Sequence, residues 1–208
     1  MLNEWSDPER VADYLQREAP HRDIAEGMLL EALPDRVERV LDLGTGDGRM
    51  LALVLSEHPD AHGLGIDSSQ PMLARARERF QDHANVELKV HDLQQPLDAT
   101  GPFDVVVSGL AIHHLDDDRK AAIFAEVHAM LDPGGVFANL DLVSSETDGL
   151  HERFLHAIGR TNEDPADQPA PLCSQLEWLR NTGFADVDCH FKWLELALTV
   201  AGRASANS

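Results

Sequence analysis

Three glycines, Gly44, Gly46 and Gly48, stand at alternate positions between an apolar run and a helical pattern, in the stretch VLDLGTGDGRML (40–51). Glycines at the junction of a strand and a helix let a ligand approach the backbone, and the first helical turn offers unpaired amide groups to it. The stretch therefore predicts a ligand-binding loop. The ligand could be a dinucleotide, a nucleoside triphosphate or a molecule without phosphate.

Two phosphate-binding loops fit this stretch poorly. A nucleoside-triphosphate loop ends in Gly-Lys followed by Ser or Thr, whereas Gly48 is followed by Arg49 and Met50, which excludes it. The dinucleotide fingerprint requires glycines at its first, third and sixth positions, and the sixth is Arg49. This mismatch disfavours a NAD(P)-dependent oxidoreductase on a Rossmann fold but leaves it as an alternative.

Two adjacent histidines, His113 and His114, follow an apolar run that ends at residue 109, and Asp141 ends a later run. Histidine titrates near neutral pH, so either imidazole could act as a general base or orient a substrate. Asp141 could orient a substrate or close a turn. These three residues are the catalytic candidates.

Apolar runs alternate with helical patterns from residue 38 onward, and this order would bring the glycines and histidines together. Continuous apolar runs that are each followed by a helix indicate a parallel sheet with both faces covered, an α/β fold. In such a sheet, ligands bind at the carboxyl ends of the strands. The predicted strands are 39–43, 61–67, 86–92, 103–109, 136–143 and two within 186–200, and the predicted helices are 49–58, 70–80, 117–131 and 172–182.

Two segments do not follow this alternation of apolar runs and helical patterns. Residues 1–37 are predicted to form an N-terminal helical cap before the main domain, residues 38–208. A helical and loop insertion, rich in Asp and Pro, is expected at about 144–171. Because it follows the fifth strand, we expect it to lie over the site and, with the cap, to set substrate choice. Trp178 and Trp193 are expected in the core.

Five separated stretches resemble the motifs of one enzyme family, in the correct order. They are LDLGTGDG (41–48), GIDSS (65–69), HDL (91–93), FDVVVSGLAIHHL (103–115) and LDPGG (131–135). Over residues 38–200 the chain is similar to the class I S-adenosylmethionine-dependent methyltransferases, and its ending resembles their small-molecule branch. The resemblance implies a Rossmann-like doubly wound seven-stranded sheet, mostly parallel with an antiparallel last strand, with helices on both faces.

The resemblance also implies S-adenosyl-L-methionine as cofactor and S-adenosyl-L-homocysteine as product. The methionine end of the cofactor carries a carboxylate and an ammonium, which suit the glycine loop, Asp42 and the backbone near Ser108. Asp67, which lies 21 residues after Gly46, would accept the ribose hydroxyls, and Asp92 would accept from the adenine amine. The residues expected to bind the cofactor are Tyr14, His21, Asp42, Gly44, Thr45, Gly46, Asp67, Ser68, Met72, Asp92, Leu93 and Ser108.

Methyl transfer would be an in-line displacement at a sulfonium carbon, so the protein would mainly align the reactants and exclude water. The acceptor would be a small molecule offering oxygen, nitrogen, carbon or sulfur. Of the two histidines, the resemblance favours His113 over His114 as the pocket residue. The acids at 116–118 are expected to form a solvated first helical turn, so no metal site is predicted. A non-catalytic S-adenosylmethionine-binding protein is the second alternative.

The chain of 208 residues holds 17 basic and 37 acidic residues, for a formal net charge of −20. This charge disfavours nucleic acid as a partner, because non-specific binding depends on clustered Lys and Arg. Cys173 and Cys189 lack disulfide or metal spacing and are typical of reduced cytosolic thiols. The sequence shows neither a signal-peptide pattern nor a membrane-spanning run. We therefore expect a cytoplasmic monomer or homodimer without nucleic-acid or membrane partners.

Overall fold

The computed structural model describes Asp7, Val11 and residues 20–205, and within these residues strands alternate with helices. The strands are β1 (Arg39–Leu43), β2 (His62–Asp67), β3 (Val86–Val90), β4 (Phe103–Gly109), β5 (Leu131–Leu142), β6 (Ala185–Trp193) and β7 (Leu196–Gly202). The helices are α2 (Arg22–Glu31), α3 (Arg49–Glu57), α4 (Gln70–Arg79), α5 (Asp117–Met130), α6 (Asp148–Ala157) and α7 (Leu172–Thr182), with a 3₁₀ turn, η2 (Ile112–His114).

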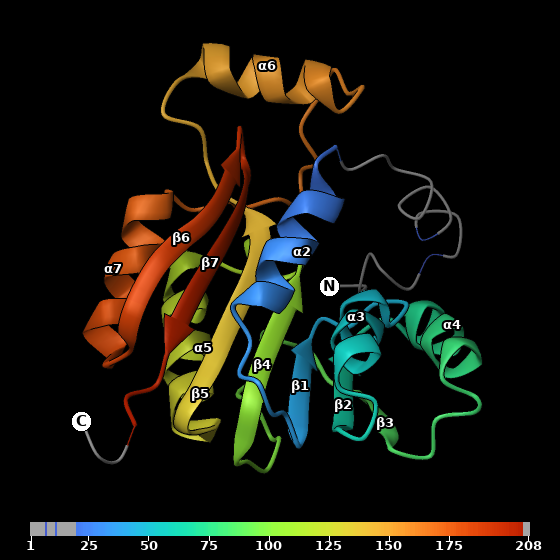
Figure 1. Ribbon diagram of the computed structural model, residues 1–208. Coiled ribbons are helices and arrows are strands. Elements are labelled where there is room, and N and C mark those ends of the chain that lie inside the picture. The colour runs from blue at the N-terminus through green and yellow to red at the C-terminus, as the bar shows by residue number, and fades with distance from the viewer. Residues whose placement is uncertain (1–6, 8–10, 12–19, 206–208) are drawn as a thin grey trace.

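The strands of the described part of the chain form one seven-stranded sheet in the order β3-β2-β1-β4-β5-β7-β6 (Figure 1). Strands β1 to β5 pair in parallel, whereas β7 is antiparallel to both of its neighbours, β5 and β6. The last strand is therefore the antiparallel one. The predicted fold, a Rossmann-like doubly wound sheet that is mostly parallel with an antiparallel last strand, is confirmed.

The register of the parallel strands brings their carboxyl ends to one edge of the sheet. Leu43 pairs with both Ile66 and Ser108, and Ser108 pairs with Asn139. The segments that follow these residues therefore start at one level. They contain the glycine loop, Asp67, the two histidines and Asp141, as the alternating sequence pattern predicted.

Neighbouring residues of each strand point to opposite sides of the sheet, and in the central strands both sides are buried against helices. Val40 and Val105 belong to an apolar cluster with residues of α2 and α3. Leu41 and Val106 belong to a second cluster with residues of α5 and α7. Figure 1 shows α2 in front of the sheet and α5 behind it.

Strand β5 begins five residues before the predicted 136. Phe103 of β4 pairs with Leu131, and the next aligned pair is Val105 with Val136, so the intervening residues form an irregularity. Gly134 adopts a φ of 86°, in the left-handed region that favours glycine. Residues 132–135, expected as a turn before the strand, are thus a bulged beginning of the strand itself.

Helix α6 lies beyond the carboxyl edge of the sheet and, with the loop after it, occupies residues 148–171 (Figure 1). Thr147 caps its first turn, where the hydroxyl oxygen accepts from the backbone N–H of Leu150 at 3.3 Å. No helix in the described part of the chain has both the length and the apolar character needed to cross a bilayer.

Candidate active site

The glycine loop is tied to the helix that follows it by one buried carboxylate. Thr45 Oγ1 donates to Asp42 Oδ2 at 2.7 Å, and the backbone N–H of Leu51 donates to the same oxygen at 3.1 Å. Gly44 has a φ of 68°, and a Cβ there would lie 2.3 Å from the Cβ of Ala111. The first glycine is therefore required both by its backbone conformation and by the close approach of the loop after β4.

Asp42 is fully buried, and its other oxygen, Oδ1, has no hydrogen-bond partner among the residues that the structure describes. Burial raises the pKa of this carboxyl group to about 7, although the bonds from Thr45 and Leu51 oppose the shift. A buried acceptor without a partner costs free energy unless a donor or cation reaches it. Asp42 therefore favours a positively charged group close to the glycine loop.

Asp67 links the ends of β1 and β2. Its Oδ2 accepts from the backbone N–H of Gly46 at 2.8 Å, and its Oδ1 accepts from the N–H of Ser69 at 2.7 Å. Burial nevertheless raises the pKa of Asp67. Each carboxylate oxygen has a second lone pair, so Asp67 can still accept from two ligand hydroxyls.

One cavity of about 1840 Å³ opens along the carboxyl ends of β1 to β5. Asp42, Ser108 and Asp141 are buried below its lining. Ser108 Oγ donates to the carbonyl oxygen of Leu43 at 2.9 Å and so joins β4 to β1. Tyr14 lies outside the described residues. The predicted residues that line the cavity are Gly44, Thr45, Gly46, Asp67, Ser68, Met72, Asp92, Leu93, His113 and His114.

His21 lies beside the cavity, where its ring packs on Trp193 with 4.8 Å between ring centroids. Trp178 packs against the core as expected. Trp193 is likewise half-buried and packs against the core, but it also lines the cavity. The sequence could not distinguish these two tryptophans, because both stand among apolar residues and only the β6–β7 hairpin brings Trp193 to the opening.

His113 is held by Asp141 from behind. The Nδ1 of His113 lies 2.5 Å from Asp141 Oδ1, and the backbone N–H of His113 donates to Asp141 Oδ2 at 2.8 Å. Both side chains are buried, with exposed fractions of 5% and 3%. The imidazole therefore presents Nε2 to the cavity in a fixed orientation.

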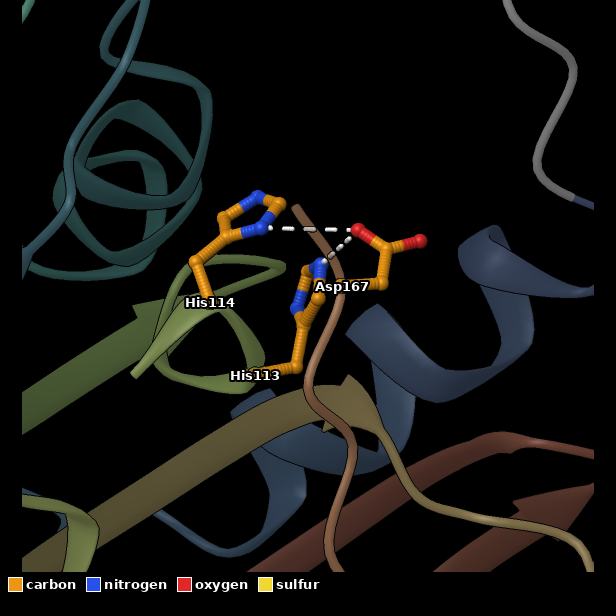
Figure 2. A group of neighbouring side chains, drawn as sticks. All are labelled: His113, His114 and Asp167. Carbon is orange, nitrogen blue, oxygen red and sulfur yellow. Dashed lines mark ion pairs between the residues drawn. The ribbon is translucent and has the colours of Figure 1, made fainter. Parts of the chain in front are cut away.

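A second carboxylate, Asp167 from the loop after α6, faces both histidines. Its Oδ1 lies 3.4 Å from His113 Nε2 and 3.4 Å from His114 Nδ1. Figure 2 shows both imidazole rings directed at this one oxygen. Asp167 was not among the predicted site residues, because the polar loop that carries it has no periodicity to fix its direction.

The two imidazoles differ in charge preference. Burial opposes the charged form of His113, but Asp141 and Asp167 outweigh it and raise the pKa of His113 to about 9. Burial and the neighbouring charge of His113 lower the pKa of His114 to about 4. At neutral pH one positive charge therefore resides on the pair, and it resides on His113.

Two arginines that sequence reasoning missed line the cavity next to the glycine loop. Glu26 of α2 accepts from Arg22 Nε at 2.7 Å, and from Nε and Nη2 of Arg49, both at 2.7 Å. Burial opposes ionisation of Glu26, yet the two arginines hold its pKa below the usual range. Glu26 and Arg49 lie far apart in the sequence, so no local pattern could have paired them.

These features fit S-adenosylmethionine, the cofactor that the resemblance implies. The unpartnered oxygen of Asp42 suits the methionine ammonium, and Arg22 with Arg49 offers positive charge to the methionine carboxylate. Asp67 ends β2 and Asp92 lies two residues after the neighbouring strand β3, and both can accept from hydroxyl and amine groups. The donor set therefore matches a zwitterionic nucleoside.

Comparison with known proteins finds methyltransferases both by sequence and by structure. Residues 40–135 match a family model described as a methyltransferase domain. The trans-aconitate 2-methyltransferase of Deinococcus radiodurans is 36% identical over 123 residues, which cover 59% of this chain and 43% of that protein. The trans-aconitate 2-methyltransferase of Rhodopseudomonas palustris is 30% identical over 193 residues, which cover 85% of this chain and 72% of that protein. A solved O-methyltransferase family protein from Burkholderia thailandensis aligns with a TM-score of 0.70 and 24% identity, over 90% of this chain and 56% of that chain.

Proposed function

The chain belongs to the family of class I S-adenosylmethionine-dependent methyltransferases, and we propose that it transfers a methyl group from S-adenosylmethionine to a small-molecule acceptor. One observation carries the proposal: a single cavity is lined by the glycine loop with Asp67 and also by His113 with His114. The first group suits the cofactor and the second a polar acceptor. The names of the two bacterial relatives give trans-aconitate, a small molecule, as the substrate of those proteins.

In this proposal the cofactor lies along the ends of β1, β2 and β3. Asp67 accepts from the ribose hydroxyls, and Asp92 accepts from the adenine amine, with the backbone amide of Leu93 beside the ring. Met72 packs on the adenine, which its position in the cavity lining supports. Asp42 faces the methionine ammonium from below, directly or through water.

Bound S-adenosylmethionine supplies a methyl group activated by its positively charged sulfur. The task of the chain is to align the acceptor with this methyl group and to exclude water. His113 and His114 form the polar wall on the acceptor side, and Asp141 is the positioning residue that fixes the His113 ring. The two histidines are the groups we assign to contact the acceptor.

The acceptor side of the cavity also has an apolar wall, which supports an acceptor with an apolar or aromatic portion. Leu142 ends β5, Leu196 begins β7, Phe154 belongs to α6, and Trp193 ends β6. Residues 144–171, together with the cap in residues 1–37, would set the choice of acceptor. The acceptor atom is oxygen, nitrogen, carbon or sulfur.

For location and partners, we propose a cytoplasmic protein without a nucleic-acid partner. Both cysteines are free thiols, which is the usual state in the cytoplasm. The net charge of −20 opposes binding to a phosphate backbone.

Calorimetric titration of the purified protein with S-adenosylhomocysteine tests the proposal directly, with NADH titrated in parallel. We expect micromolar, one-to-one binding of S-adenosylhomocysteine, and no heat from NADH. Binding of NADH alone would indicate that residues 44–49 form an unusual dinucleotide loop.

A screen of small acceptors with S-adenosylmethionine then tests turnover. Substitution of His113 by Ala should lower the rate of methyl transfer far more than the cofactor affinity. Cofactor binding without turnover of any acceptor, unaffected by changes at His113, His114 and Asp141, would favour a non-catalytic binding protein.

A further inference from the structure

We propose that His113, His114 and Asp167 form a three-ligand site for a first-row divalent cation such as Zn²⁺, with an open position that takes an oxygen atom of the acceptor (Figure 2). The cation site stands on the geometry of these three side chains alone. The acceptor part of the inference rests on the proposed methyl transfer. The sequence predicted no metal site, because Asp167 lies 53 residues after His114 in a loop without periodicity.

The distances from Asp167 Oδ1 to the two ring nitrogens suit a shared metal ion. Asp167 Oδ1 lies 3.4 Å from each of the two ring nitrogens, and the three donor atoms lie within 4.8 Å of one another. Donors that each bind zinc at about 2.0–2.1 Å in tetrahedral geometry are about 3.4 Å apart. A good N–H···O bond would instead be about 2.7–3.2 Å long. The Nδ1 of His114 also lies 3.3 Å from the carbonyl oxygen of Ala166, so coordination through Nδ1 would require the proton of that ring to be on Nε2.

Asp141 supplies the outer-shell carboxylate that histidine ligands usually have. Metal-bound histidines generally donate their second ring N–H to a carboxylate, which fixes the tautomer and the ring orientation. The Nδ1 of His113 is 2.5 Å from Asp141 Oδ1 and can keep its proton there. A bound metal ion would displace the Nε2 proton of the charged ring, and the Nε2 lone pair would then point toward Asp167. This arrangement needs no movement of the His113 ring.

The loop that carries Asp167 is fastened to the histidine turn. The backbone N–H of Gln168 donates to the carbonyl oxygen of His113 at 2.8 Å, and Gln168 Nε2 donates to the carbonyl oxygen of His114 at 3.2 Å. Lys120 Nζ also donates to the Gln168 carbonyl oxygen. These bonds hold Asp167 in place although it is distant in sequence from the histidines. A site that binds its ion before the substrate arrives needs such support.

The nature of the donors selects the ion. Two imidazoles with one carboxylate suit Zn²⁺ and similar first-row ions, whereas Mg²⁺ and Ca²⁺ prefer oxygen donors. Catalytic zinc sites use three protein ligands and leave one position open. All three residues line the cavity, so the open position faces the space where the acceptor would lie.

The charges around the site suit a cation with one anionic ligand. Asp141 and Asp167 both face His113, while Arg160 Nη1 lies 4.0 Å from Asp167 Oδ2, the oxygen that faces away from the histidines. A coordinated acceptor hydroxyl is more acidic, because the ion stabilises the oxyanion. Its proton leaves to solvent, the oxygen forms a bond to the methyl carbon, and the electrons of the broken carbon–sulfur bond remain on sulfur. The acceptor class is therefore one with a hydroxyl or enol oxygen able to coordinate the ion.

Metal titration of the full chain, stripped of metal with a chelator, tests the site without reference to turnover. We expect one Co²⁺ per chain with the visible absorption of a low-coordinate site, displacement by Zn²⁺, and no competition from Mg²⁺. His114→Ala and Asp167→Asn should each weaken Co²⁺ binding at least about 100-fold, and Asp141→Asn about 10- to 100-fold. His156→Ala is the matched control, because His156 also lines the cavity but lies outside the cluster, and it should leave binding unchanged.

Titration with S-adenosylhomocysteine on the same samples separates this inference from the proposed function and shows that each variant is folded. Retained binding of S-adenosylhomocysteine with no Co²⁺ binding to the unsubstituted chain would overturn the metal site and leave the methyltransferase proposal standing. Stoichiometric Co²⁺ binding without S-adenosylhomocysteine binding would support the metal site and overturn the methyltransferase proposal. Equal losses of Co²⁺ affinity in His156→Ala and in Asp167→Asn would also overturn the metal site.

Discussion

At the residue scale, the buried carboxyl group of Asp42 lowers the stability of the ligand-free protein, and a bound cation would offset this loss. Its carboxyl group is buried, one oxygen has no partner among the described residues, and burial raises its pKa from the usual 3.8 to about 7. Between about pH 4 and pH 7 the folded state therefore holds a proton that the unfolded state has lost. The free energy of unfolding falls as the pH rises through this window, by about 4 kcal/mol for a shift of about three units.

Replacing Asp42 by Asn should stabilise the ligand-free protein at alkaline pH and weaken cofactor binding. The amide keeps an oxygen for Thr45 and Leu51 but removes the buried charge, so at pH 8 we expect a melting temperature higher by about 2–4 °C per kcal/mol gained. At pH 4 most of the gain should vanish, because Asp42 is then protonated in the folded state and about half protonated in the unfolded state of the parent protein. Thermal melts at the two pH values, with S-adenosylhomocysteine titrations, check this. A lower melting temperature at pH 8 would show that the unpaired oxygen is solvated or bonded in solution.

Substitution of Asp67 should remove most of the cofactor affinity. Two charge-assisted bonds to the ribose hydroxyls are each worth about 1.5–3 kcal/mol, so Asp67→Ala should weaken S-adenosylhomocysteine binding at least about 100-fold. The loss includes the bond from the Gly46 backbone, which orients the glycine loop. In the proposed binding mode Asp92 accepts one hydrogen bond from the adenine amine, so Asp92→Ala should weaken binding by only about tenfold in calorimetry. An affinity for Asp67→Ala within about threefold of the parent would mean that the acid after β2 only shapes the loop.

At the scale of elements, the sequence predicted the parts that carry their own periodicity. Helix α7 and its end at Gly183, with a φ of 106°, followed from regular apolar spacing and a glycine cap. The glycine loop, Asp67 and the histidine turn were placed at one edge because strand order alone brings them there. Asp167 could not be predicted, because backbone bonds to the histidine turn, not a local pattern, determine its position. The pairing of Glu26 with Arg49 could not be predicted either, because it joins two helices and no local sequence pattern indicates it.

Helix α6 is attached to the β6–β7 hairpin through a buried carboxylate. Glu195, 3% exposed, accepts from Ser145 Oγ at 2.6 Å and contacts His151 Nδ1 of α6 at 2.9 Å. The bond to Glu195 raises the pKa of His151 against opposing desolvation, with smaller contributions from the charges of Glu163 and Asp148. Because folding raises the pKa of a cationic group, this attachment is fully present below the usual pKa of about 6.5 and is lost as the pH rises through the raised value.

Removal of His151 should therefore loosen α6 in a pH-dependent way. His151→Ala should increase hydrogen exchange of amides 148–157 relative to the parent at pH 6, and the difference should shrink at pH 9. The change should be small, because a third of the His151 side chain is exposed and the interaction is screened. His156→Ala, on the same helix with an exposed side chain, is the control and should show no such trend. An equal increase at both pH values would mean that packing, not charge, attaches the helix.

At the scale of the whole molecule, the excess of acidic residues should exclude nucleic acid. In the short basic cluster at 75–79, the charge of Arg79 is offset by Asp47, which lies 2.5 Å away. Fluorescence anisotropy with duplex DNA and with transfer RNA should detect no complex at about 150 mM salt, because few counterions can be released. A sub-micromolar complex would show that a local basic surface overrides the net charge of −20.

The same net charge should make the stability of the folded chain depend on salt. A charge of −20 on a chain of 208 residues repels itself more strongly in the compact state than in the unfolded chain. Raising sodium chloride from about 10 mM to about 1 M shortens the screening length from about 30 Å to about 3 Å, which removes most of this repulsion. The melting temperature should rise by about 2–6 °C, corresponding to about 1–2 kcal/mol. Potassium chloride serves as the control and should give the same curve, because screening does not depend on the identity of the cation. A melting temperature that falls with salt would mean that surface ion pairs such as Arg36–Glu38 and Arg79–Asp47 contribute more to stability than the repulsion costs.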